Sequence, residues 1–265
     1  MHGPPRAVLF TPDTLRGRDG DANLTMGAGD DFNYSVRVSA RARRVRLLVN
    51  PRDGLVVVVP RGFDERKVPS ILHTHAEWVE RAVGRNAERR AHLEAHETGP
   101  IPARVELPGI GVAWDVVLRP SDSAGVRGRV AGESIVLTGE TGDREACYEA
   151  LRRAVARAAR ERLPLMLGGV EAETGWSASR VSVRRQRTRW GSCSAKKALS
   201  LNESLVFLPQ SLVRYVLIHE LAHTRRMDHS PAFWALVEQH DAAWRAQRRA
   251  LREGWRYVPG WADPA

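Results

Sequence analysis

The strongest constraint on this chain is a His-Glu-x-x-His pattern at residues 219–223, which lies inside a run of apolar residues at helical spacing. A separation of four residues places His219 and His223 on one face of a helix, about 6 Å apart along its axis. Glu220 lies about 100° around the same helix from His219, so its carboxylate can face a metal-bound water without being a ligand. This arrangement is typical of zinc hydrolases and predicts a metal site on a helix.

The helix that carries this pattern is predicted to span residues 211–224. Its apolar residues recur at helical spacing, which indicates burial on one side: Leu212, Val213, Val216, Leu217 and Leu221. Pro209 suits the opening turn, and Ser211 can cap it. A single buried histidine would be explained by hydrogen bonding in the core, but two imidazoles with Glu220 between them favour a metal site.

A third ligand is needed for a site with three protein groups and one open position. His229 follows His223 by six residues, and the preference of zinc for nitrogen favours it over the nearby alternatives Asp228, Glu238, His240 and Asp241. Ser230 can cap a second helix with Pro231 at its first position, so His229 would lie at the foot of that helix. The spacing also matches the metzincin pattern, but Arg226 occupies the place of the glycine that makes the metzincin turn.

The composition is that of a globular cytoplasmic protein. The 265 residues suffice for one large or two modest domains, and two cysteines, Cys147 and Cys193, are too few for a disulfide framework. No apolar run approaches 18 residues and the N-terminus has no signal-peptide core, so no membrane span is expected. The net charge of +10 favours acidic partners and leaves nucleic-acid binding open, although the arginines are scattered along helices.

The chain is expected to divide into four segments. Residues 1–30 are rich in Gly, Pro and Asp without periodicity, so they are expected to be a disordered tail with Met26 as an alternative start. Residues 31–140 are expected to form a β-rich region with one helix. Residues 141–257 are expected to form the domain that carries the histidines, and 258–265 a second tail.

Periodicity also predicts the individual elements. Strands are predicted at 34–38, 45–49, 55–59, 104–107, 112–118, 126–130, 135–137, 181–183, 188–193 and 198–201. Helices are predicted at 68–91, 143–167 and 233–251 in addition to 211–224. The dipeptide Asp53-Gly54 predicts a hairpin turn between two of the strands.

Four motifs follow one another in the second half of the chain: 189–194, 201–202, 215–223 and 229–234. In this order they resemble the YgjP-like metallopeptidase domain, which is similar to the SprT-type zinc proteases. The strand pair at 34–49, the strand 54–60 and Trp78 match the beginning of such proteins, so the resemblance covers about residues 34–251. Arg214, Thr224 and the arginine-rich helix at 144–162 depart from the family pattern without touching the proposed ligands.

The resemblance implies an α+β fold of the zincin-like type, in which the active-site helix lies under a small sheet and a β-rich region precedes the catalytic domain at 141–257. It implies a zinc ion (Zn²⁺) bound by His219, His223 and His229, a general base at Glu220, and hydrolysis of peptide bonds in a peptide or protein substrate. Some YgjP-like proteins are described as nucleotide pyrophosphatases, so a metal-dependent nucleoside triphosphate pyrophosphohydrolase is the alternative enzyme. A DNA-associated protease or scaffold is the third function that the resemblance leaves open.

Two further expectations concern substrate binding. An extended peptide is expected to pair with an edge strand near 198–201. Strand alternation over 184–189 places Arg185, Arg187 and Arg189 on one face, where they could hold the phosphates of a nucleotide. Trp190 is expected to pack in the core, and Cys193 to be a small buried residue rather than a nucleophile or a ligand.

Overall fold

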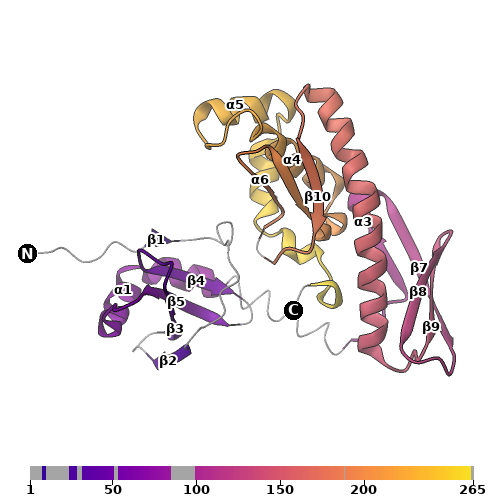
Figure 1. Ribbon diagram of the computed structural model, residues 1–265, viewed down its shortest axis with the longest axis horizontal. Coiled ribbons are helices and arrows are strands. Elements are labelled where there is room, and N and C mark those ends of the chain that lie inside the picture. Colours follow the sequence, from indigo (N-terminus) through magenta and orange to yellow (C-terminus); the bar gives the residue numbers. More distant parts are fainter. Residues whose placement is uncertain are drawn as a thin grey trace, which may run out of the picture. The chain divides into compact units, whose positions relative to one another are not determined.

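The computed structural model describes residues 8–9, 24–28, 32–50, 53–84, 99–187 and 189–263. The fold is mixed α+β, and the chain forms two compact units, Met1–Glu94 and Ala95–Ala265. Figure 1 shows the elements of both units in sequence colours. None of the helices in the described residues combines the length and the apolar character needed to cross a membrane.

The first unit is built on a five-stranded sheet in the order β1-β4-β5-β3-β2. The strands are β1 (Val8–Leu9), β2 (Leu24–Ala28), β3 (Asn33–Ser39), β4 (Arg46–Asn50) and β5 (Gly54–Pro60). The predicted hairpin at residues 53–54 is confirmed, because β4 and β5 pair antiparallel and Gly54 adopts a φ of 66°, which favours glycine. One sheet face packs on helix α1 (Val68–Thr74) and on the helical residues 76–84.

Two expectations for the first unit differ from the structure. Residues 1–30 were expected to lack structure, yet β1 pairs with β4 and β2 pairs with β3. Strand pairing at a sheet edge uses main-chain groups, so it does not require the apolar periodicity that the segment lacks. The helix predicted at 68–91 is interrupted by a turn at His75, whose backbone leaves the helical region, and residues 85–91 lie outside the described residues.

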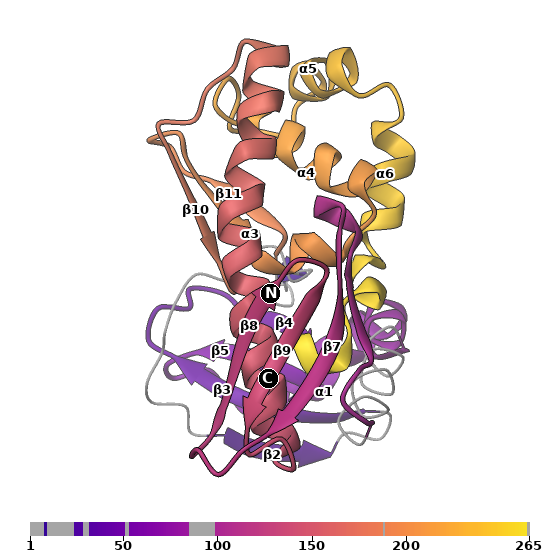
Figure 2. The same cartoon turned by 90° about the vertical axis from the view of Figure 1, so that its right-hand side faces the viewer.

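The second unit combines two sheets with one long helix. A four-stranded sheet has the order β6-β7-β9-β8, with β6 (Arg104–Leu107), β7 (Val112–Pro120), β8 (Val126–Ala131) and β9 (Ser134–Gly139). A three-stranded sheet has the order β10-β12-β11, with β10 (Arg180–Arg184), β11 (Gly191–Cys193) and β12 (Ala198–Asn202). Helix α3 (Arg144–Thr174) runs past both sheets, as Figures 1 and 2 show.

The ends of α3 follow from its flanking residues. The Asp143 side chain accepts a hydrogen bond from the Ala146 backbone N–H and caps the first turn. Gly175 ends the helix with a φ of 70°. Along its length α3 buries an apolar stripe that includes Leu151 and Leu163.

The domain boundary expected at residue 140 is wrong. The inward side chains of the four-stranded sheet, among them Ile135 and Leu137, form one hydrophobic core with Leu151 of α3 and with the histidine-bearing helix. This sheet cannot stand alone, because its apolar face needs the cover that α3 supplies. The boundary therefore falls between residues 94 and 95.

Four more elements complete the second unit: the 3-10 helix η4 (Glu203–Phe207), α4 (Gln210–Ala222), α5 (Pro231–His240) and α6 (Trp244–Leu251). The single helix expected at 233–251 is broken at Asp241, whose side chain accepts a hydrogen bond from the Ala243 backbone N–H. The strand expected at 198–201 is β12, which lies in the middle of its sheet and not at an edge. The edges on either side of it are β10 and β11, and β11 is shorter than the strand expected at 188–193.

The C-terminal tail expected at 258–265 is instead part of the core over the described residues. Trp261 is buried, with its ring stacked on Tyr148 of α3 and edge-on to Phe207. The guanidinium of Arg152 donates a hydrogen bond of 2.8 Å to the Trp261 carbonyl. A segment this short shows no periodicity, so the sequence carries no signal of its docking other than the tryptophan itself.

We predict that Trp261→Ala lowers the free energy of unfolding by about 3 kcal/mol, because it removes a buried aromatic side chain from a close-packed site. Urea denaturation followed by circular dichroism measures the change. Tyr257→Ala is the control, because Tyr257 is about half exposed and its loss leaves no cavity. Equal midpoints for Trp261→Ala and the wild type would contradict the docking of this segment.

Candidate metal centre

Three histidines converge at one end of α4. The nitrogen atoms that His219, His223 and His229 can offer to a metal ion all lie within 4.8 Å of one another. The Nε2 atoms of His219 and His229 are 3.2 Å apart. Two nitrogens bound to one tetrahedral ion at 2.0–2.1 Å are about 3.3 Å apart, so this separation suits a shared ion.

Burial of α4 fixes two of these histidines. The helix was expected to be buried on one side, but its apolar residues are buried nearly all round, from Leu212 to Ala222. Pro209 precedes the first turn, as expected, while Ser211 makes no cap hydrogen bond. A helix enclosed in this way cannot rotate or slide without losing core packing, so His219 and His223 have fixed positions.

A short turn returns the chain to place the third histidine. The helix ends where the Thr224 hydroxyl and backbone N–H both donate to the Leu221 carbonyl. In the turn, the Asp228 carboxylate accepts a hydrogen bond from the Ser230 backbone N–H. Pro231 then begins α5, which leaves His229 at the foot of α5 as the sequence predicted.

The other ligands considered for the third position have different partners. Asp228 holds the turn, Glu238 pairs with Arg245, and Asp241 accepts a hydrogen bond from the Ala243 backbone N–H. His240 packs edge-on against Trp176, with ring centroids 4.7 Å apart. Only His229 joins His219 and His223 within the described part of the chain.

The hydrogen bonds and ionisation of the imidazoles fit metal binding. Nδ1 of His223 lies 3.0 Å from the Arg226 carbonyl, so it can carry the proton and leave Nε2 free as a ligand. Burial, together with the charges of His223, His229 and Arg248, lowers the pKa of His219 to about 3. Burial also lowers the pKa of His223. Both imidazoles are therefore held in the neutral form that a metal ion requires.

Aromatic side chains of α5 hold the imidazole rings in place. Phe233 is fully buried and stacks on His223, with ring centroids 4.5 Å apart, and its ring makes an angle of 75° with that of His219. Trp234 stacks on His229 at 5.5 Å and lies 5.7 Å from the ring of His219. The histidines thus stand against a rigid apolar wall, which limits the rotamers they can adopt.

Glu220 lies beneath strand β11, next to the histidines in the sequence but outside their cluster. Its side chain is buried, and it passes so close to Gly191 that a Cβ atom at residue 191 would lie 2.7 Å from its Cγ and 2.8 Å from its Oε1. A side chain at residue 191 would therefore displace the carboxylate. Sequence reasoning missed this role of Gly191, although the glycine in the Trp190-Gly191-Ser192 motif was the available signal.

Cys193 also lies near this carboxylate. Burial raises the pKa of the Cys193 thiol to about 11, and the negative charge of Glu220 acts in the same direction. The thiol is protonated at neutral pH, and Cys193 does not belong to the cluster of candidate ligands. Cys193 is partly buried, whereas the sequence led us to expect a buried residue, and a protonated thiol is a poor nucleophile.

The arginine face expected over residues 184–189 is not part of a strand. Strand β10 ends at Arg184, so the following residues do not alternate as they would in a strand. Arg185 is directed to Glu203, at 3.9 Å, and to the Asp263 carbonyl, at 3.5 Å. Trp190 packs in the core as expected, stacked on Trp255 with ring centroids 4.0 Å apart.

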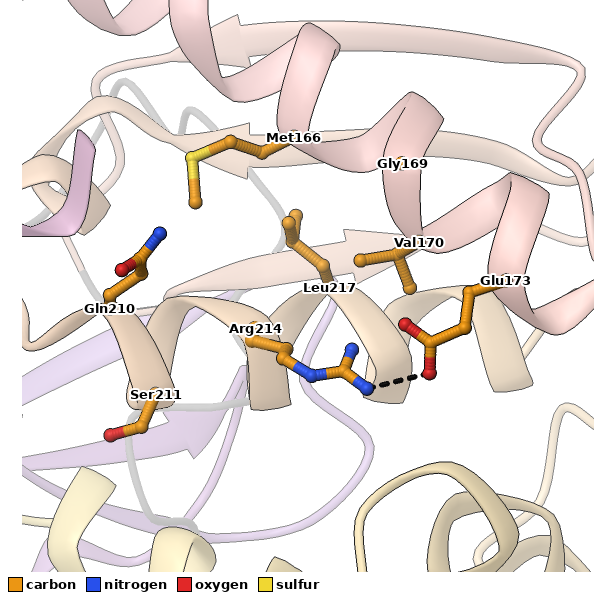
Figure 3. Close-up of a pocket in the computed structure, with 8 residues that line it drawn as sticks. All are labelled: Met166, Gly169, Val170, Glu173, Gln210, Ser211, Arg214 and Leu217. Carbon is orange, nitrogen blue, oxygen red and sulfur yellow. Dashed lines mark hydrogen bonds and ion pairs between the residues drawn. The ribbon is translucent and has the colours of Figure 1, made fainter. Parts of the chain in front are cut away.

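A hollow of about 440 Å³ lies between α3 and α4, as Figure 3 shows. Arg214 crosses it and forms an ion pair with Glu173 at 2.6 Å. Leu217, which forms part of the lining, is about 200° around α4 from His219, so this hollow is on the far side of the helix from the histidine cluster. It therefore contributes no group to the candidate metal centre.

Comparison with known proteins identifies the family. The family model described as YgjP-like, metallopeptidase domain, matches residues 43–254, a span that includes Glu220 and all three histidines. No curated protein and no solved structure matches this sequence. Because the family model covers most of the chain, and because the structure brings together the three histidines of its motifs, the chain belongs to the YgjP-like metallopeptidase family.

Proposed function

We propose that this protein is a zinc-dependent peptidase with a zincin-like arrangement, in which His219, His223 and His229 bind one zinc ion and Glu220 is the general base. The convergence of the three imidazoles beside a buried carboxylate carries the proposal. Three imidazole nitrogen donors, two of them 3.2 Å apart, favour zinc over magnesium or calcium, which prefer oxygen ligands. A zinc ion held in this way would supply Lewis acidity, lowering the pKa of a bound water to about 7 and polarising a carbonyl group.

In this proposal, Glu220 moves protons without binding the metal. Helix geometry turns it about 100° away from His219, toward β11 and not toward the ligand nitrogens. Its carboxylate would take a proton from the attacking water and deliver it to the nitrogen of the leaving amine. Gly191 supports this role because the backbone of β11 can then pass directly over the carboxylate.

The free edge of β11 is the proposed site for the peptide backbone. This edge replaces the one expected at 198–201, because β12 has neighbours on both sides and β11 has one. An extended peptide that adds to β11 by main-chain hydrogen bonds would lie next to Glu220. The contact between Gly191 of β11 and Glu220 of α4 also supports a zincin-like arrangement, in which a small sheet lies over the active-site helix.

The nucleotide alternative has less support than the peptide. It relied on strand alternation over residues 184–189, but β10 ends at Arg184, and Arg185 is engaged by Glu203 and the Asp263 carbonyl. A role for the protein at DNA stays a prediction from the net charge and the resemblance. Peptide-bond hydrolysis is therefore the function that the geometry supports best.

We expect the zinc-loaded wild type to cleave casein and to leave nucleoside triphosphates intact. Glu220→Gln should keep both the fold and the zinc while peptide hydrolysis falls by about 10²–10⁴-fold, since the proton carrier is lost and the ligands are unchanged. Casein cleavage, triphosphate release and zinc content are measured on both proteins. Undiminished cleavage by the variant would remove Glu220 from the mechanism, and hydrolysis of triphosphates alone would overturn the peptidase assignment.

A second substitution tests the contact between β11 and Glu220. Gly191→Ala should retain zinc but lower kcat by up to about 10²-fold, because the new Cβ displaces the general base. Gly168→Ala is the matched control, since a Cβ added at this exposed site in α3 meets no atom within 4 Å. Equal kcat values for Gly191→Ala and Gly168→Ala would show that the close approach has no bearing on catalysis.

A further inference from the structure

Arg248 of α6 and the histidine cluster both contact the indole ring of Trp234. Its guanidinium carbon is 4.6 Å from the centroid of the Trp234 ring. The same indole stacks on the His229 imidazole at 5.5 Å, with an angle of 22° between the rings. Trp234 therefore contacts both a candidate metal ligand and a cationic side chain.

The indole that Arg248 contacts is itself fixed. Trp234 stacks on Trp244 with ring centroids 4.3 Å apart and an angle of 10°, and Trp244 is buried. These parallel rings join α5 to α6 beside the metal centre. Arg248 thus rests on a rigid surface, and the conformational entropy lost on binding an anion is small.

The charge of Arg248 has no partner among the described residues. The side chain is exposed, and no carboxylate in the described part of the chain forms an ion pair with it. Arg245 makes a useful contrast, because it lies over the Trp244 ring at 4.5 Å and is paired with Glu238. Arg245 and Arg248 thus each contact one of the two stacked tryptophans. Arg248 contacts Trp234, which is the tryptophan stacked on His229, and has no ion pair among the described residues.

The chemistry of a stacked guanidinium indicates what it can bind. Contact of its flat face with an indole leaves the N–H groups at its edge free to donate, and a carboxylate can accept two of them in parallel. The candidate ligands nearby are three imidazoles and include no carboxylate that could pair with this charge. An anionic group of the substrate is therefore the natural partner for the edge of Arg248.

The distance from the metal centre indicates which group of a substrate this is. The Trp234 ring is 5.5 Å from the ring of His229 and 5.7 Å from that of His219. An extended peptide advances about 3.3 Å per residue. A carboxylate at Arg248 would thus belong to a side chain about two or three residues from the bond that is cleaved.

We propose that Arg248 determines specificity by binding an acidic side chain of the peptide substrate, two or three residues from the cleaved bond. This inference rests on the proposed peptidase function, and it adds that the substrates are acidic peptides. Arg248 acts by binding and has no part in the transfer of protons. Trp234 and Trp244 are positioning residues that hold it.

The test compares pairs of peptides that differ only by Glu or Gln at each of the three positions on either side of the cleaved bond. The zinc-loaded full chain should show a kcat/KM about 10-fold higher for the Glu peptide at one of these positions, expressed mainly in KM. Arg248→Gln should bring this Glu-to-Gln ratio close to one, and Arg248→Lys should restore part of it. Arg249→Gln, with the same charge change at an exposed neighbour, should keep the wild-type ratio.

Peptide hydroxamates with the same Glu or Gln side chain separate this inference from the proposed function, because their binding to the zinc-loaded protein needs no turnover. Calorimetry should show tighter binding of the Glu hydroxamate to the wild type and to Arg249→Gln, but not to Arg248→Gln. Cleavage of peptides without a Glu preference would overturn the inference alone. Absence of all peptide cleavage would overturn the proposed function, and equal affinities of the two hydroxamates for the wild type would then overturn the inference as well.

Discussion

The metal centre depends above all on the burial of helix α4. Its apolar residues are enclosed on nearly every side, so the helix has one position and His219 and His223 share it. The turn that follows is closed by hydrogen bonds of Thr224 and Asp228, and it is just long enough to bring His229 back to within 3.2 Å of His219. Phe233 contacts the rings of all three histidines and so helps to hold them together. The packing of α4 therefore contributes both to the stability of the core and to the geometry of the site.

Different elements pack on different sides of α4, and we assign each a different role. Strand β11 covers Glu220 through Gly191 and lies at an edge of its sheet, where we propose that a peptide backbone binds. Helices α5 and α6 form the opposite wall, where stacked tryptophans place Arg248 near the cluster. Helix α3 packs in the same hydrophobic core as α4 and the four-stranded sheet. On this account, β11 binds the backbone of the substrate and Arg248 selects among side chains.

Local patterns in the sequence predicted the site better than they predicted the fold around it. The spacing of His219 and His223, and the start of α5 at Pro231, are properties of single helices, and the structure has them as expected, although the Ser230 side chain makes no cap hydrogen bond. Sheet order is a long-range property, so the central position of β12 and the early end of β10 could not be read from alternation. The docking of Trp261 and the sharing of one core by β9 and α3 are equally non-local. The role of Gly191 was visible as a motif, but its reason, the approach of Glu220, is a tertiary contact.

The central claim is that His219, His223 and His229 together hold one zinc ion, and X-ray absorption at the zinc edge tests it most directly. The account predicts three imidazole nitrogens at about 2.0–2.1 Å and one further light ligand, with no sulfur at about 2.3 Å. In His229→Ala, one imidazole contribution should disappear and the affinity for zinc should fall. A sulfur ligand in the wild type, or a spectrum and an affinity left unchanged by His229→Ala, would contradict the account.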